Sequence, residues 1–600
     1  MKISKTLYKK SISALNKNEL SNVKNIQKII DKTCNDQKKL KIGIVRSFTL
    51  ETQTDFIKLA LSILPSKVEL KLSNLNNIEQ EVLNPKSTIL SWEPDIVLIL
   101  WRIEELIPNI KEEFININER KIKSFLKELK KRINTIIKNY FKISNTPIVI
   151  STLPNSHLSY DHNYKEHSSI HEFINHINDF ILREARNNKN LHIFEFNKWS
   201  NNIGNLFHDE KMDYYAKQAI SLNFIGNFSL FLARSLRPLI LSSAKAIAID
   251  LDNVLWGGVL GEDGVNNLHI DYNFPGNIYR SIQLKIKSLK KKGFLIFLLS
   301  KNNLNDVKVA FKKLNDMPLK LNDFDALKVN WKEKHENIKD LSKTFNIGLE
   351  SFVFIDDQKF EQKQMNYYNK EVITLLVDDD PINILNEIDN CVYLDKSNTN
   401  NEDLLRNDDY KANIERSKLK NKINDSSSFL KSLELKAKIK KINKDNINRA
   451  FDLIHKTNQF NLRTNRISLK RLKDIADNKS NVSLVISLSD KFGNQGIIGL
   501  IIGILNQQKN SIFIDNFLLS CRAIGRGVED ILFYDFLQKV KKIKILKIES
   551  EYISTSKNNQ VANLYAKFGF KNKLKNKKKS LYFLDLPTKY NKPDWIKLLK

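Results

Sequence analysis

The chain has 600 residues, 41% of them hydrophobic, and a formal net charge of +30. This length exceeds what one hydrophobic core supports and predicts about three or four domains. No apolar run is long enough to cross a bilayer, and the three cysteines, Cys34, Cys391 and Cys521, are too few for a disulfide framework. These features predict a cytoplasmic protein without a membrane span.

The positive charge is spread along a chain rich in Lys, Asn and Ile. Basic runs such as 436–444 and 571–579 are typical of solvated faces. No motif of interleaved basic and aromatic residues accompanies them. We therefore expect no nucleic-acid partner, and a basic nucleic-acid-binding protein is the least favoured alternative. The charge remains compatible with an acidic protein partner.

The first 240 residues predict a helical arm, residues 1–40, and an α/β domain, residues 41–240. Ser47 follows the first expected strand, and we interpret it as a helix N-cap in preference to a nucleophile. Strands that alternate with helices indicate a parallel sheet. The four expected strands lie near residues 42–45, 96–100, 147–150 and 192–196.

The most informative stretch is AIAIDLDNVLWGGVLGEDG, residues 246–264. A short apolar strand leads into Asp250 and Asp252. Because the side chains of a strand alternate, we expect both carboxylates to leave the strand end on the same side. Two crowded carboxylates need a cation or a proton between them. Mg²⁺ is the natural choice, because it is small and prefers oxygen ligands.

Three further elements follow in the same α/β domain, residues 244–390. Ser300 ends the apolar run 294–299, and its hydroxyl can hold a phosphoryl oxygen. Lys334 can neutralise charge on a nucleophile and a phosphate. Ligands collect at the carboxyl ends of parallel strands, which predicts one shared site. The expected metal ligands are Asp250, Asp252, Asp356 and Asp357.

Four segments resemble, in this order, the motifs of haloacid dehalogenase-like (HAD) phosphatases. They are DLDN (250–253), SKNN (300–303), NWKEK (330–334) and FIDD (354–357). The narrower resemblance is to the FkbH-like, or HAD-IIIC, branch. It implies that Asp250 attacks phosphorus and that Asp252 first protonates the leaving group and then activates water. One departure is QKFEQ at 358–362, where the family usually has Asn-Pro-x-Glu-Arg.

Residues 391–430 are polar and predict a linker. In the C-terminal domain, residues 431–600, the segment SCRAIGRG (520–527) joins an expected strand to an expected helix. A row of backbone N–H groups at a helix N-terminus binds pyrophosphate. The segment resembles the acyl-CoA loop of GNAT-type N-acetyltransferases, which implies CoA or an acyl-phosphopantetheine as ligand. The implied contacts are Arg522, Gly525, Arg526, Gly527, Asn558 and Tyr565.

Two segments of this domain leave alternatives open. Cys521, beside Arg522 and a helix N-terminus, is either an acyl-carrying thiol of lowered pKa or an inert buried residue. The segment KTNQFN, residues 456–461, also resembles the FkbH-like pattern. Its simpler interpretation is a polar turn that hydrogen-bonds between strands.

The whole pattern predicts an α/β, multi-domain chain: an SGNH-like α/β domain, a central HAD-like parallel sheet and a GNAT-like α+β domain. The SGNH resemblance is faint, because Val45-Arg46-Ser47 stands in place of Gly-Asp-Ser, so we expect a docking or substrate-recognition domain there. The resemblance implies dephosphorylation of a small phosphorylated acid and transfer of its acyl group to an acyl carrier protein. The alternative is a CoA-dependent N-acetyltransferase with a HAD domain that positions substrate.

Overall fold

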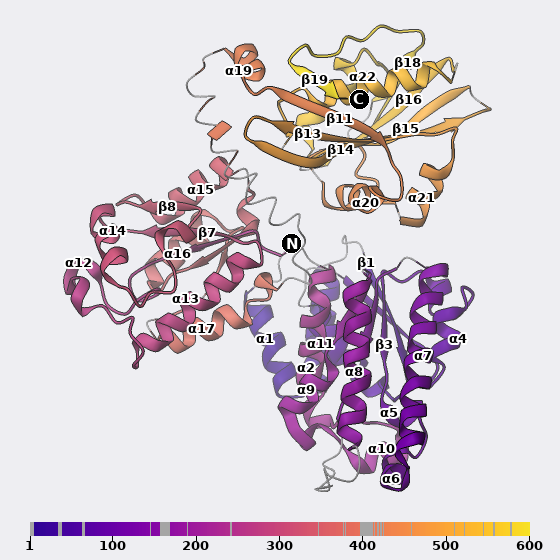
Figure 1. The fold of residues 1–600 in the computed structure, drawn as a ribbon, viewed down its shortest axis with the longest axis vertical. Coiled ribbons are helices and arrows are strands. Elements are labelled where there is room, and N and C mark those ends of the chain that lie inside the picture. The colour runs from indigo at the N-terminus through magenta and orange to yellow at the C-terminus, as the bar shows by residue number, and fades with distance from the viewer. Residues whose placement is uncertain are drawn as a thin grey trace. The chain divides into compact units, whose positions relative to one another are not determined.

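The computed structural model describes residues 5–599 except 34–38, 63–66, 145, 156–168, 189, 241–242, 346, 376, 379, 396–411, 413–414, 417–418, 420–422, 424, 458, 468, 509, 521–522, 544, 556–557 and 576–578. The chain divides into two compact units, Met1–Ser242 and Ser243–Lys600. The second unit holds two separate sheets. Figure 1 shows all three sheets with their helices.

The first unit is built on a parallel sheet of five strands in the order β2-β1-β3-β4-β5. Its edge strand β2 was not among the expected strands, because lysines and glutamate alternate with its apolar residues. The other four strands are confirmed near their expected positions. The bounds are β1 Lys39–Arg46, β2 Lys67–Leu72, β3 Ile96–Leu100, β4 Ile148–Ser151 and β5 Leu191–Phe194.

Helices cover both faces of this sheet, because successive residues of its strands point to opposite sides. In β1, Ile42 and Ile44 belong to one core and Val45 to the other. The N-terminal arm supplies Leu15 and Ile30 to the first core, so it packs as part of this unit. The helices that pack in that core are α1 (Lys5–Asn16), α2 (Leu20–Thr33), α3 (Thr54–Ser62) and α11 (Ile225–Ile240). The helices in the other core are α4 (Ile78–Leu83), α7 (Glu119–Ile143) and α8 (Ile170–Asn187).

The second sheet, also parallel, has the strand order β10-β9-β6-β7-β8. All four residues of β6 are buried, as expected for a strand covered by helices on both faces. The strands are β6 Ala246–Ile249, β7 Leu295–Ser300, β8 Ala326–Val329, β9 Phe352–Ile355 and β10 Ile373–Thr374. One face packs on α13 (Gly276–Lys291), α14 (Leu304–Lys313) and α17 (Pro381–Asn390), and the other on α15 (Lys334–Phe345) and α16 (Lys359–Tyr368).

The third sheet is mixed and mainly antiparallel, which confirms the expected α+β arrangement. The strands on its main path are β17 Lys571–Lys575, β18 Lys579–Asp585, β16 Lys547–Ile553, β15 Ser511–Leu519, β14 Gly493–Asn506, β13 Val482–Asp490, β11 Leu435–Lys441 and β19 Ile596–Leu599. Its helices are α19 (Ser426–Ser432), α20 (Ile447–Lys456), α21 (Leu469–Asp477), α22 (Val528–Lys541) and α23 (Leu564–Lys567).

Two strand pairs of this sheet are parallel, β11 with β19 and β15 with β16. Strands β15 and β16 pair only over Ser511–Phe513 and Lys547–Glu549. Beyond these residues the short strand β12, Phe460–Asn461, pairs with the end of β15. Among the helices described, none has the length and hydropathy that a membrane span requires.

Candidate active site

The carboxyl edge of the second sheet collects a compact group of charged side chains. Asp250 follows β6, Asp356 follows β9, and Lys334 begins α15. The Lys334 ammonium lies 2.7 Å from Asp250 Oδ2 and 2.6 Å from Asp356 Oδ2. All three side chains are at most 4% exposed. The order of the parallel strands therefore places the expected nucleophile, cation and carboxylate in direct contact.

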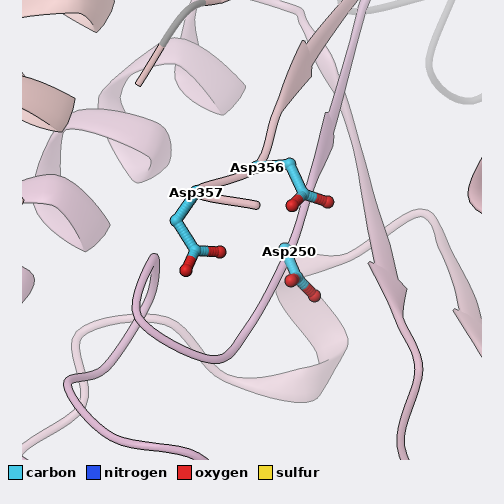
Figure 2. Close-up of side chains that lie close together, drawn as sticks. All are labelled: Asp250, Asp356 and Asp357. Atoms are coloured by element: carbon cyan, nitrogen blue, oxygen red, sulfur yellow. The ribbon is translucent and has the colours of Figure 1, made fainter. Parts of the chain in front are cut away.

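Asp250, Asp356 and Asp357 each offer a carboxylate oxygen within 4.8 Å of the other two. Figure 2 shows the three side chains close together, with Asp250 on one segment and the other two on the loop after β9. Asp250 Oδ1 and Asp357 Oδ1 are buried and have no hydrogen-bond partner among the described residues. Mg²⁺ prefers oxygen ligands, and carboxylate oxygens that accept no hydrogen bond are free to bind it. The residues present therefore fit a magnesium ion.

Asp252 was expected in this ligand set, and its carboxylate lies outside it. Its Oδ1 accepts hydrogen bonds from Trp256 Nε1 at 2.9 Å and from the Leu260 N–H at 3.1 Å. Its Oδ2 accepts from Asn302 Nδ2 at 2.8 Å. The reason is that β6 ends at Ile249 and the next residues turn, so the alternation of a strand no longer applies. The structure thus separates Asp252 from the three-carboxylate cluster.

The turn after Asp252 is tightly constrained. Asn253 has a left-handed backbone, φ 53°, and its side chain accepts a hydrogen bond from the Gly258 N–H. Gly258 is also left-handed, at φ 98°. A Cβ at Gly257 would come within 2.7 Å of the Tyr279 ring. The glycines therefore permit the close approach that brings Trp256 against Asp252.

Ser300, at the end of β7, is 3% exposed and accepts a hydrogen bond from Asn302 Nδ2 at 3.0 Å. Asn302 contacts both Ser300 and Asp252, and it was not among the residues expected at the site. Its position in the SKNN segment was the only signal available. Its role depends on two strands that are distant in sequence, which a linear pattern does not show.

The pKa directions follow from burial and from the crowding of charge. Burial alone would lower the pKa of Lys334, but the charges of Asp250 and Asp356 outweigh it and raise the pKa. Burial and the Asp250 charge raise the pKa of Asp356, and they raise that of Asp357 to about 6. Burial also raises the pKa of Asp252, against the hydrogen bonds that it accepts. Without a metal ion, the carboxyl groups of the site therefore hold protons more tightly than isolated carboxyl groups do.

The segment that departs from the expected family pattern still anchors this edge of the sheet. The Gln362 side chain donates to the backbone oxygens of Asp356 and Val377, at 2.6 and 2.7 Å. Lys301 forms ion pairs with Glu361 at 2.7 Å and with Glu333 at 3.2 Å. These contacts tie together the loops that follow β7, β8 and β9.

In the third sheet, the expected phosphate-binding loop is described in part. Cys521 and Arg522 lie outside the described residues. Gly525 and Gly527 both have φ 78°, and Gly527 is the N-cap of α22. The Trp595 indole donates to the Arg526 carbonyl at 3.0 Å, and its ring lies 3.0 Å from the position of a Cβ on Gly527. The described part of the loop thus leads into the N-terminus of α22, as expected, and is contacted by the C-terminal segment.

Asn558 and Tyr565 occupy internal positions in this domain. The Asn558 amide donates to the carbonyls of Asn461 and Ile553, both at 2.9 Å, and its oxygen accepts from the Thr555 N–H. Tyr565 is 1% exposed, and burial raises its pKa. These contacts give Asn558 a structural role, and the contact of either residue with a cofactor stays a prediction.

In KTNQFN, Phe460 and Asn461 form the short strand β12, which pairs with β15, and the two residues that follow hydrogen-bond to β15 and β16. The Leu462 N–H donates to the Phe517 carbonyl of β15, and the Leu462 carbonyl accepts from the Ile553 N–H of β16. Arg463 Nε donates to Glu551 Oε1 at 3.0 Å, and its Nη1 donates to the Asp515 carbonyl at 2.9 Å. This segment therefore connects β15 and β16 where the two strands part.

Ser47 in the first unit is not a helix cap, because the helical turn that follows begins at Glu51. Its hydroxyl donates to Glu105 Oε2 at 2.9 Å and accepts from the Arg102 N–H at 3.2 Å. His208 Nε2 lies 2.8 Å from Asp213 Oδ2. The hydrogen bonds of the Ser47 hydroxyl go to Glu105 and to the backbone of Arg102, and a docking role for this domain stays a prediction.

Comparison with solved structures places this geometry in a known fold. The N-terminal part of BF1531 from Bacteroides fragilis, which contains a phosphatase domain and was crystallised with Mg, is similar over 63% of this chain and 99% of its own, at 23% identity and a TM-score of 0.55. At that identity the likeness is one of fold. No family model and no curated protein matches the chain.

Smaller likenesses involve acetyltransferases. The ribosomal-protein-S18-alanine N-acetyltransferase of Escherichia coli is similar over 26% of this chain and 96% of its own, at 10% identity and a TM-score of 0.21. The GNAT domain of S. lividans PAT is similar over 25% of this chain and 89% of its own, at 15% identity and the same TM-score.

Proposed function

We propose that this chain is a magnesium-dependent phosphatase of the HAD type, acting on a small phosphorylated acid. The observation that carries the proposal is the cluster of Asp250, Asp356 and Asp357, two of which also contact the buried Lys334 ammonium. The site combines a nucleophilic carboxylate, oxygens that fit a divalent cation and a separate carboxyl group of raised pKa. This combination is what phosphoryl transfer through an aspartyl phosphate requires.

In the first step an oxygen of Asp250 attacks phosphorus, and the bond from phosphorus to the leaving oxygen breaks. The leaving oxygen keeps the electron pair and takes the proton of Asp252. In the second step a water oxygen attacks the aspartyl phosphate while Asp252 takes the water's proton. The bond from phosphorus to Asp250 breaks, which releases phosphate and restores both carboxyl groups.

The remaining residues bind and orient the phosphoryl group. The Ser300 hydroxyl lies at the same sheet edge and can donate to a phosphoryl oxygen. Lys334 lies beside the nucleophile and offsets the charge of the two anions that must meet. Asp250, Asp356 and Asp357 would hold Mg²⁺, which supplies Lewis-acid stabilisation of the phosphoryl charge when bound.

The test is phosphate release from a panel of small phosphorylated acids by the full chain with Mg²⁺, together with mass spectrometry of the intact protein. We expect release to coincide with a transient mass increase of one phosphoryl group on Asp250. Release that persists in Asp250→Asn, or no release from any phosphate ester, would contradict the proposal.

We further propose that the C-terminal domain transfers an acyl group, with CoA or the phosphopantetheine of an acyl carrier protein as its ligand. Support comes from the left-handed Gly525 and Gly527 at the N-terminus of α22, where backbone N–H groups can bind phosphate. The carrier thiol would displace phosphate from the carbonyl carbon of an acyl phosphate, so intact-mass analysis after incubation with 1,3-bisphosphoglycerate and candidate carriers tests this. An acyl adduct on a carrier is expected, and a carrier whose mass never changes contradicts the proposal.

A further inference from the structure

The side chain of Asn302 joins two groups that the proposed reaction uses. Its Nδ2 lies 2.8 Å from Asp252 Oδ2 and 3.0 Å from Ser300 Oγ, and the residue is 7% exposed. An amide nitrogen carries two N–H donors. An ionised carboxylate only accepts hydrogen bonds, so the atom that faces Asp252 is the nitrogen. One donor is therefore directed to each partner.

We infer that Asn302 is a positioning residue that orients both Asp252 and Ser300 for phosphoryl transfer; this rests on the proposed phosphatase function. Asp252 Oδ1 already accepts from Trp256 Nε1 and from the Leu260 N–H. Each carboxylate oxygen has two favourable acceptor directions. Oδ2 accepts only from Asn302 among the described residues, which leaves one direction for a proton. The transferred proton is therefore held at Oδ2, on the oxygen that Asn302 fixes.

The same amide sets the direction of the Ser300 hydroxyl. A hydroxyl carries one hydrogen and can accept at its lone pairs. Because Ser300 Oγ accepts from Asn302, its own hydrogen stays available to a phosphoryl oxygen. Asn302 thus links the group that binds the phosphoryl oxygen to the group that protonates the leaving oxygen. A purely structural asparagine would not distinguish between leaving groups.

Two esters separate these possibilities. Departure of p-nitrophenolate needs little protonation, whereas departure of the alkoxide of 3-phosphoglycerate depends on the general acid. In Asn302→Leu we expect kcat/KM to fall more for 3-phosphoglycerate than for p-nitrophenyl phosphate. The difference should be about tenfold to a hundredfold, because the variant loses a hydrogen bond to a charged group. In Ser300→Ala both esters should lose activity equally, because phosphate binding is common to them.

A double mutant locates the effect. If Asn302 acts through Asp252, adding Asn302→Leu to Asp252→Asn should cause no further selective loss on 3-phosphoglycerate. Asn303→Asp is the matched control, because this exposed neighbour only caps α14 through its side-chain oxygen. Both activities of the control should equal the wild type. If Asn302→Leu does not fold, as judged by its melting temperature, Asn302→Ser takes its place.

The outcomes are distinct. Equal losses on the two esters, or full additivity in the double mutant, would overturn the role of Asn302 while the wild-type phosphatase activity stands. A wild-type protein that hydrolyses neither ester with Mg²⁺ would overturn the proposed function, and the role of Asn302 with it. A selective loss that disappears in the Asp252→Asn background would establish the positioning role.

Discussion

The Lys334 ammonium lies between Asp250 and Asp356, 2.7 Å from one carboxylate and 2.6 Å from the other. Each of these side chains is nearly inaccessible to water, so their charges are screened weakly. Lys334 thus pairs with two carboxylates at this edge of the sheet, and Asp357 adds a third carboxylate within 4.8 Å of both. The site carries excess negative charge that a divalent cation would neutralise.

Replacing Lys334 by Met should therefore destabilise the metal-free protein. Removing one partner of a buried ion pair costs about 3–5 kcal/mol, because the carboxylates lose their counter-charge. Thermal unfolding of Lys334→Met and wild type, each with and without Mg²⁺, measures this. We expect a lower melting temperature for the variant and a larger stabilisation by Mg²⁺. A variant as stable as wild type without metal would contradict the buried ion pair.

Asp250→Asn should abolish phosphate release while the protein stays folded. The substitution removes the nucleophile and one negative charge from a crowded group, so we expect turnover to fall by about a thousandfold or more with no loss of melting temperature. Phosphate assays and thermal unfolding of the same preparation give both quantities. The matched control is Asp316→Asn, an exposed aspartate of the same domain, which should retain wild-type turnover.

Chelation should remove activity reversibly. The three carboxylates supply hard oxygen ligands, and the small cation Mg²⁺ fits such a set better than larger cations do. Treatment with a chelator followed by titration with Mg²⁺ or Ca²⁺ measures the recovery of phosphate release. We expect recovery with Mg²⁺ and little with Ca²⁺. In Asp357→Asn more Mg²⁺ should be needed for half recovery. Full activity in the presence of excess chelator would exclude the metal.

Local sequence rules located most of the site because each group follows a buried strand. Ser300 ends a parallel strand, and Asp250 and Asp356 directly follow two others, so the fold must bring them to one edge. The same reasoning failed for Asp252, because its backbone had already left the strand. The left-handed conformation of Asn253 and the approach of Trp256 decide where that carboxylate faces. Neither follows from the period of a strand.

Contacts between distant segments were not predictable in the same way. Asn302 and the pairing of Lys301 with Glu333 and Glu361 depend on the order of strands in the folded sheet. The edge strand β2 was missed because lysine and glutamate interrupt its apolar residues. The sequence indicates which residues end each strand, and the folded chain determines which of them meet.

Arg463 provides a test in the C-terminal domain. Its guanidinium contacts Asp515 and Glu551, whose side chains are 6% and 7% exposed. Arg463→Leu leaves both carboxylates without this partner and should destabilise the domain by about 3–5 kcal/mol. Lys579→Ala is the control, because Lys579 contacts the same Glu551 but is 45% exposed, and it should cost at most about 1 kcal/mol. Denaturant unfolding of the two variants gives the comparison, and equal effects would contradict it.

The contacts of Asp213 indicate how acid affects the stability of the first unit. Burial alone would raise its pKa, but hydrogen bonds from His208 and Arg102 lower it well below the ordinary value of 3.8. Above that ordinary value the carboxylate is ionised in the folded and the unfolded chain, and its stabilising contribution is fully present. As the pH falls below it, the unfolded chain binds the proton first, so the contribution is lost progressively.

Asp213→Asn should therefore unfold at a lower temperature than wild type near neutral pH, and the difference should shrink as the pH falls from about 5 to about 3. Scanning calorimetry of the full chain across this pH range measures the unfolding temperatures of the variant and of the wild type. Asp55→Asn is the control: its carboxylate is 45% exposed and lies 3.6 Å from Lys24 at the surface, so its curve should parallel the wild type. A difference between Asp213→Asn and wild type that is constant with pH would show that the lost contacts do not depend on the charge of Asp213.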